Sequence, residues 1–223
     1  MRSLKREIAL AAGVAALALV LLPPLSGAAQ QSISLHMLQH LLLILAAAPL
    51  LVVSGAFAGI NRLPWTRKLA QPVTAWLVFV AVFLFWHWPA ALQWAADTAA
   101  SRMLEHASIL LSAMLFWSVA LAFNGPGSWS DGARALWVMT AAIATDLPGV
   151  IMVFSPRTLC AMPRESPWRW ALTPLEDQQI AGLLMWVPAN LIFFGIAMAL
   201  FARWMSDGKP VSRSPPSREM VSR

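Results

Sequence analysis

The sequence is poor in charge and in cysteine. Only 12% of its 223 residues are Asp, Glu, Lys or Arg, whereas a soluble domain carries about 25%. With 59% hydrophobic residues, this composition excludes an ordinary soluble fold and indicates an integral membrane protein. The single cysteine, Cys160, excludes an intramolecular disulfide and cannot form a thiolate metal site. No G-x-S-x-G or H-E-x-x-H motif is present, so we do not expect an enzyme.

Long apolar runs predict an all-α integral membrane fold. A helix needs about 20 apolar residues to cross roughly 30 Å of hydrocarbon. Runs of this kind lie at about 8–25, 36–54, 72–89, 103–123, 134–154 and 178–204. We therefore expect a bundle of about six transmembrane helices in one domain, residues 31–205.

The two ends of the chain differ from this domain. Residues 1–30 form an N-terminal membrane anchor or a signal-like segment, with small residues near Gly27 where a signal would be cleaved. The Pro23–Pro24 pair and the length of the run favour a retained anchor. Residues 206–223 are rich in Ser, Pro and Arg and predict a disordered basic tail in the cytoplasm.

The 16 Lys and Arg residues divide unequally between the two sides of such a bundle. One set of loops holds only Arg102, Arg157, Arg164 and Arg169. Positive residues are retained on the cytoplasmic side, so both termini are predicted to be cytoplasmic and these four arginines to lie outside. The net charge of +6 then reflects topology and anionic lipid, and we expect no nucleic-acid partner.

All four histidines are predicted to lie on the outer side. His36 and His40 begin the second apolar run, His87 ends the third, and His106 begins the fourth. Residues four apart share a helix face at about 5–6 Å, and histidine is the commonest metal ligand. Taken singly, His36, His40 and His87 are also explained as hydrated histidines at the membrane interface. His106 is also explained as a histidine at a helix start that pairs with Glu105. Their common depth favours one shared metal site.

Other polar or sulfur-containing residues complete this prediction. Met185 lies on the same helix face as Gln178 and would offer a thioether, and with neutral imidazoles this donor set suits Cu(I). Asp177 and Gln178 precede the sixth run, where Thr173 and Glu176 resemble a capping box, and helix capping is compatible with a role of Asp177 and Gln178 in supporting the site. Asp146 lies inside the fifth run beside Pro148, either as a proton or ion contact or as a partner of freed backbone groups.

Several short motifs together resemble the CtaG family of cytochrome c oxidase assembly factors. They cover about residues 32–204 in matching order: HMLQH from His36, WHWP around His87, Glu105-His106, FSPR from Phe154, and PLEDQQ from Pro174 followed by GLLMWVP. The chain departs from the family at Cys160, where a tyrosine is expected, and at Asp146. It contains no tyrosine at all.

The resemblance implies a bacterial plasma-membrane protein that helps to mature a haem-copper oxidase through its copper. It carries His36, His40, His87 and His106 over as the family's histidine positions. We expect copper to be bound at the outer, periplasmic side and delivered to an oxidase subunit. Two alternatives stay open: a haem b electron-transfer protein with two histidines as axial ligands, such as His87 and His106, and a structural scaffold without metal.

Overall fold

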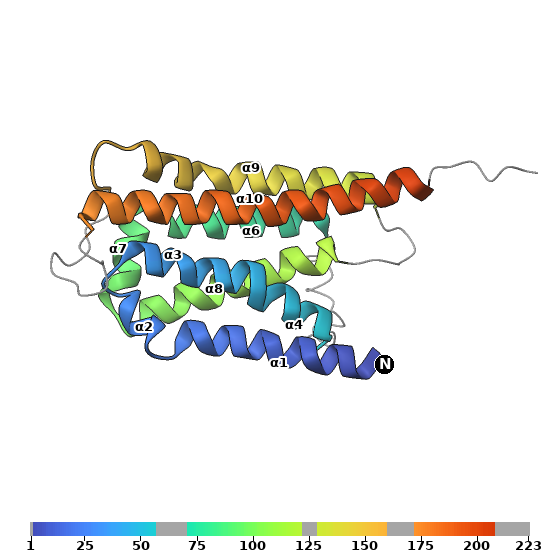
Figure 1. Cartoon of the computed structure of the whole chain (residues 1–223), viewed down its shortest axis with the longest axis horizontal. Coiled ribbons are helices and arrows are strands. Elements are labelled where there is room, and N and C mark those ends of the chain that lie inside the picture. The colour runs from blue at the N-terminus through green and yellow to red at the C-terminus, as the bar shows by residue number, and fades with distance from the viewer. Residues whose placement is uncertain (1, 57–70, 122–128, 160–171, 208–223) are drawn as a thin grey trace, which may run out of the picture.

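The computed structural model is a bundle of antiparallel helices (Figure 1). It describes residues 2–56, 71–121, 129–159 and 172–207, and within these ranges it contains no strand. Cys160 and the basic tail predicted for residues 206–223 lie outside the described residues, except for the two residues that end the last helix. The helices are α1 (Arg2–Leu21), α2 (Leu25–Ala28), α3 (Ile33–Leu41), the π-helix η1 (Leu42–Ala47), α4 (Ala48–Ser54), α6 (Pro72–Trp86), α7 (Pro89–Asp97), α8 (Ala99–Ala120), α9 (Asp131–Phe154) and α10 (Pro174–Asp207).

The predicted all-helical membrane class is confirmed for the described chain. Four continuous segments are long and apolar enough to cross a membrane: Ile33–Ser54, Ala99–Ala120, Asp131–Phe154 and Pro174–Ser206. The pair α6 and α7, bent by 74°, makes five if it is counted as one span. Helix α1 carries Lys5, Arg6 and Glu7 in its first turns and is not among these spans. The number of six spans therefore stays a prediction.

The helices alternate in direction along the bundle. Helices α3, α8 and α10 begin at one end of the bundle, where α7 also lies (Figure 1). The first turns of α1 and the last turns of α10 lie at the opposite end. The chain segments that carry the four histidines therefore meet at one end of the bundle.

The second span changes its winding directly after His40. Residues Leu42–Ala47 form the π-helix η1 before α4 resumes. Pro49 has no backbone N–H to donate within this span. The indole Nε1 of Trp117 on α8 donates to the Ile44 carbonyl oxygen at 2.6 Å. Because π-helical turns are rare and concentrate at functional sites, η1 indicates a functional site near the histidines that precede it.

Helices α9 and α10 pack closely. A Cβ placed on Gly182 would lie 2.6 Å from the Gly149 carbonyl oxygen, so the two backbones approach each other where neither residue has a side chain. The predicted capping box starts α10: the Thr173 N–H donates to Glu176 Oε2 at 2.7 Å, and the Glu176 N–H donates to Thr173 Oγ1 at 3.3 Å. These contacts fix the position at which α10 begins.

A cluster of stacked aromatic rings fills the bundle between α6, α8, α9 and α10. The Phe116 ring lies 4.5 Å from Trp137 and 4.7 Å from Phe79, and Trp117 stacks on Phe193 at 5.7 Å, all between ring centroids. The indole of Trp137 donates to the Pro72 carbonyl oxygen at 3.0 Å. This aromatic core holds the helices that carry the histidines.

Candidate metal centre

Asp177 fixes the start of α3, the helix that carries His36 and His40. Its carboxylate accepts hydrogen bonds from the Ile33 N–H at 2.8 Å and from the Ser34 N–H at 3.3 Å. Only 1% of the Asp177 side chain is exposed. A carboxylate at a helix N-terminus satisfies free N–H groups and favours the helix dipole. Asp177, which was predicted to support the site, therefore links α10 to the first turn of α3.

Gln178, the next residue, binds the end of α9. Its Oε1 accepts from the Leu159 N–H at 2.6 Å, and its Nε2 donates to the carbonyl oxygens of Met152 at 3.2 Å and Arg157 at 3.3 Å. The side chain is fully buried. Its hydrogen bonds thus go to backbone groups, and Gln178 positions α9 relative to α10.

His36, His40 and Glu105 meet between α3 and α8. The Nε2 atoms of His36 and His40 lie 3.1 Å and 3.3 Å from the same atom, Glu105 Oε1. The two imidazole rings are 4.6 Å apart between centroids, as their spacing on one helix face predicts. One ligand atom from each of the three residues lies within 4.8 Å of the other two, and all three side chains are buried.

His106 and His87 adjoin this group. The ring of His106 is 6.0 Å from the rings of both His36 and His40, and the ring of His87 is 5.3 Å from that of His40. The Nδ1 of His87 lies 2.6 Å from the Phe83 carbonyl oxygen. Because a carbonyl oxygen only accepts, Nδ1 carries the proton, and a neutral His87 has its free lone pair on Nε2.

Unpartnered polar atoms gather in this cluster. In the described part of the chain, the buried side-chain atoms without a polar partner include Nδ1 of His40, Nε2 of His87, Nε2 of His106 and Oε2 of Glu105, whereas Nε2 of His40 faces Glu105 Oε1. Native interiors leave few such atoms without a partner. Imidazole nitrogen and carboxylate oxygen are donors that bind copper and zinc. The residues therefore fit a bound transition-metal ion.

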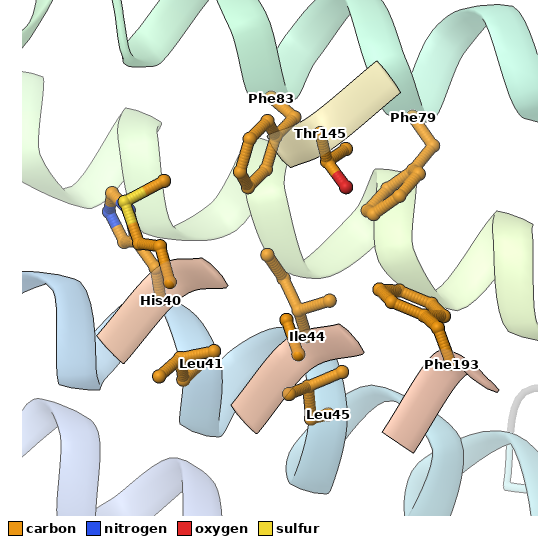
Figure 2. Close-up of a pocket in the computed structure, with 10 residues that line it drawn as sticks. His40, Leu41, Ile44, Leu45, Phe79, Phe83, Thr145 and Phe193 are labelled. Carbon is orange, nitrogen blue, oxygen red and sulfur yellow. The ribbon is translucent and has the colours of Figure 1, made fainter. Parts of the chain in front are cut away.

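A small cavity adjoins His40 and extends toward the aromatic core. Figure 2 shows His40 at one end of it and Phe79 and Phe193 at the other. Its volume is about 20 Å³, room for roughly one water-sized sphere. Met185, the predicted thioether, lines this cavity together with His40. Met185 is 6% exposed, so its side chain belongs to the interior at this level of the bundle.

The structure brings most predicted site residues together and gives two carboxylates unexpected partners. Glu105, predicted as a possible partner of the adjacent His106, instead forms its ion pairs with His36 and His40 on another helix. A carboxylate inside an apolar run was the only signal for this role. Asp146 lies outside the cluster, and its Oδ1 accepts from Asn190 Nδ2 at 2.7 Å. It joins α9 to α10.

Comparison with known proteins agrees with the resemblance drawn from the motifs. Residues 2–207 match the family model described as cytochrome c oxidase caa3 assembly factor (Caa3_CtaG). Searches of curated proteins and of solved structures give no match. Since the family model covers nearly the whole chain, this protein belongs to the cytochrome c oxidase caa3 assembly factor family.

Proposed function

We propose that this assembly factor binds copper among His36, His40, His87 and His106 and delivers it to a subunit of a haem-copper oxidase. Membership of the family supplies the role in oxidase assembly. The observation that carries the copper site is the set of buried donor atoms without hydrogen-bond partners, on three imidazoles and one carboxylate. Copper is the cargo in this proposal, and the protein itself catalyses no reaction.

Two features support a copper ion over haem b. The cavity beside His40 has a volume of about 20 Å³, whereas pockets for larger ligands measure roughly 300 Å³ or more. The rings of His36 and His40 lie 4.6 Å apart, and those of His106 and His87, the predicted axial ligands of haem, lie 6.0 Å and 5.3 Å from that of His40, all between centroids. Imidazoles this close suit one shared ion better than the two opposite faces of a porphyrin.

We further propose that the histidine end faces the periplasm across the bacterial plasma membrane, with both termini in the cytoplasm. The unequal distribution of Lys and Arg supports this orientation. The hydrogen bond from Gln39 Nε2 to the Val20 carbonyl oxygen, 2.6 Å long, supports α1 as a retained sixth span. A membrane-impermeant thiol reagent should then label Cys160 without lysis of the plasma membrane. Labelling that needs lysis would contradict the orientation.

The test of copper delivery uses His106→Ala in cells grown with limiting copper. The variant should accumulate normally, because loss of a neutral imidazole leaves no buried charge and costs on the order of 1–2 kcal/mol. Oxidase activity should fall, and added copper should partly restore it, since a higher free-metal concentration offsets weaker binding. Met103→Ala provides the control, because Met103 lies on the same helix and is 66% exposed.

The contrary outcomes separate the alternatives. Full oxidase activity in His106→Ala under copper limitation would contradict delivery through this site. Activity that falls and does not recover with any amount of copper would favour a scaffold or a haem protein. A Soret band in the purified protein would distinguish the haem protein from the scaffold.

A further inference from the structure

We propose that Glu105 is itself a metal ligand, and that it makes this centre one for copper in the divalent state. The inference rests on the proposed copper site and specifies which form of copper that site takes. It also revises the preference for Cu(I) that the histidines and Met185 suggest from sequence.

The Glu105 carboxylate lies next to the imidazole nitrogens of α3. The side chain is fully buried, and Oε1 lies 3.1 Å and 3.3 Å from the Nε2 atoms of His36 and His40. Those are the nitrogen atoms that would bind a metal on this face of α3. Any ion held between the two imidazoles therefore lies within reach of the carboxylate.

The Glu105 carboxylate carries a buried charge. In the described chain its ion-pair partners are His36 and His40, which are neutral when they act as metal ligands. Its second oxygen, Oε2, is buried without a hydrogen-bond partner. A buried carboxylate needs a cation or donors close to it, because an unpaired buried charge is costly. A metal ion bound by the imidazoles meets that need.

The chemistry of the donors then selects the oxidation state. Cu(I) favours soft thioether and thiolate sulfur, whereas sites of imidazole nitrogen and carboxylate oxygen suit Cu(II). Met185 lines the cavity next to His40, and Glu105 Oε1 lies 3.1 Å and 3.3 Å from the Nε2 atoms of the two imidazoles on α3. The ion position shared by His36, His40 and Glu105 thus has two nitrogen donors and one oxygen donor.

The test compares Cu(II) and Cu(I) affinities of the full chain in detergent, before and after Glu105→Gln. The substitution keeps the side-chain size and removes the charge. Affinity for Cu(II) should fall by more than the roughly tenfold to hundredfold that is lost with an outer-shell partner, and affinity for Cu(I) by a smaller factor. Electron paramagnetic resonance should show a Cu(II) signal with nitrogen hyperfine structure in the wild type. Glu176→Gln is the matched control, because Glu176 is exposed and glutamine also serves a capping box.

Three outcomes would overturn the inference. Unchanged Cu(II) affinity would show that Glu105 is no ligand, and equal losses for both oxidation states would reduce it to a counter-charge. If Glu105→Gln does not fold, an infrared difference spectrum of the wild type replaces it, and Cu(II) loading that shifts no carboxylate stretch contradicts the proposal. If the wild type binds copper in neither state, the proposed function fails together with this inference.

Discussion

The histidine end and the aromatic core of this bundle are both buried, yet they differ in whether their buried polar atoms have hydrogen-bond partners. In the aromatic core, the indole N–H groups of Trp117 and Trp137 each donate to a backbone carbonyl oxygen, at 2.6 Å and 3.0 Å. At the histidine end, ring nitrogens of His40, His87 and His106 are buried without hydrogen-bond partners. The two regions are neighbours, since one cavity borders both His40 and Phe193.

This difference separates the part of the molecule that holds the fold from the part that can hold a ligand. Rings that stack and satisfy their own polar atoms contribute packing to the bundle whether or not a metal is bound. Buried donors that lack partners weaken the apo-protein and gain their partners when a cation binds. Substitutions in the two regions should therefore change different measurements.

The largest effect on stability is expected for Phe116→Ala in the aromatic core. Phe116 is fully buried against Phe79 and Trp137, and loss of such a ring costs about 3–5 kcal/mol. Unfolding in detergent, followed by circular dichroism, measures the loss. Copper bound per folded molecule should not change. Phe194→Ala is the control, because Phe194 is 54% exposed and should cost much less.

A smaller effect, on metal binding alone, is expected for His40→Ala. Loss of this donor should weaken copper binding by more than the roughly tenfold to hundredfold that is lost with an outer-shell partner, as measured by competition with a copper chelator. Gln39→Ala is the matched comparison, because the Gln39 side chain donates to the Val20 carbonyl oxygen of α1, and adjacent residues project about 100° apart around a helix. It should lower stability without weakening copper binding. Equal losses of copper affinity in both variants would contradict the paired imidazoles on α3.

The smallest effect is expected for Asp177→Asn. The variant keeps one oxygen acceptor for the first turn of α3 but loses the second acceptor and the negative charge at the helix N-terminus, a change of up to about 2 kcal/mol for a buried group. The unfolding free energy should fall by that amount and the copper affinity only slightly, because Asp177 acts on His36 and His40 only through α3. A loss of copper binding as large as that of His40→Ala would indicate that Asp177 is a ligand and would contradict its role as a support of α3.

Much of this arrangement could be predicted from the sequence. The apolar runs predicted the helices, and the positions of His36, His40, His87 and His106 at the ends of those runs predicted that they would meet. The Thr173–Glu176 capping box could also be predicted, because it depends on residues three apart. Contacts of this kind follow from local periodicity and from the alternating direction of spans.

Contacts between distant helices could not be predicted in the same way. The pairing of Glu105 with His36 and His40 depends on the rotation of α8 against α3, which the sequence of α8 alone does not determine. The bonds from the α3 backbone to Asp177, and from Asn190 to Asp146, join residues on different helices that are 144 and 44 positions apart. The π-helix η1 after His40 also had no clear signal, apart from Pro49.

The most direct test of the account is a metal analysis of the purified protein together with its optical spectrum. We expect copper in roughly equimolar amount to the chain after loading and dialysis, no Soret band, and loss of the bound copper when His36, His40, His87 and His106 are all replaced by alanine. A Soret band that disappears in the same variant, with no copper retained by the wild type, would contradict the copper centre and identify the histidines as haem ligands.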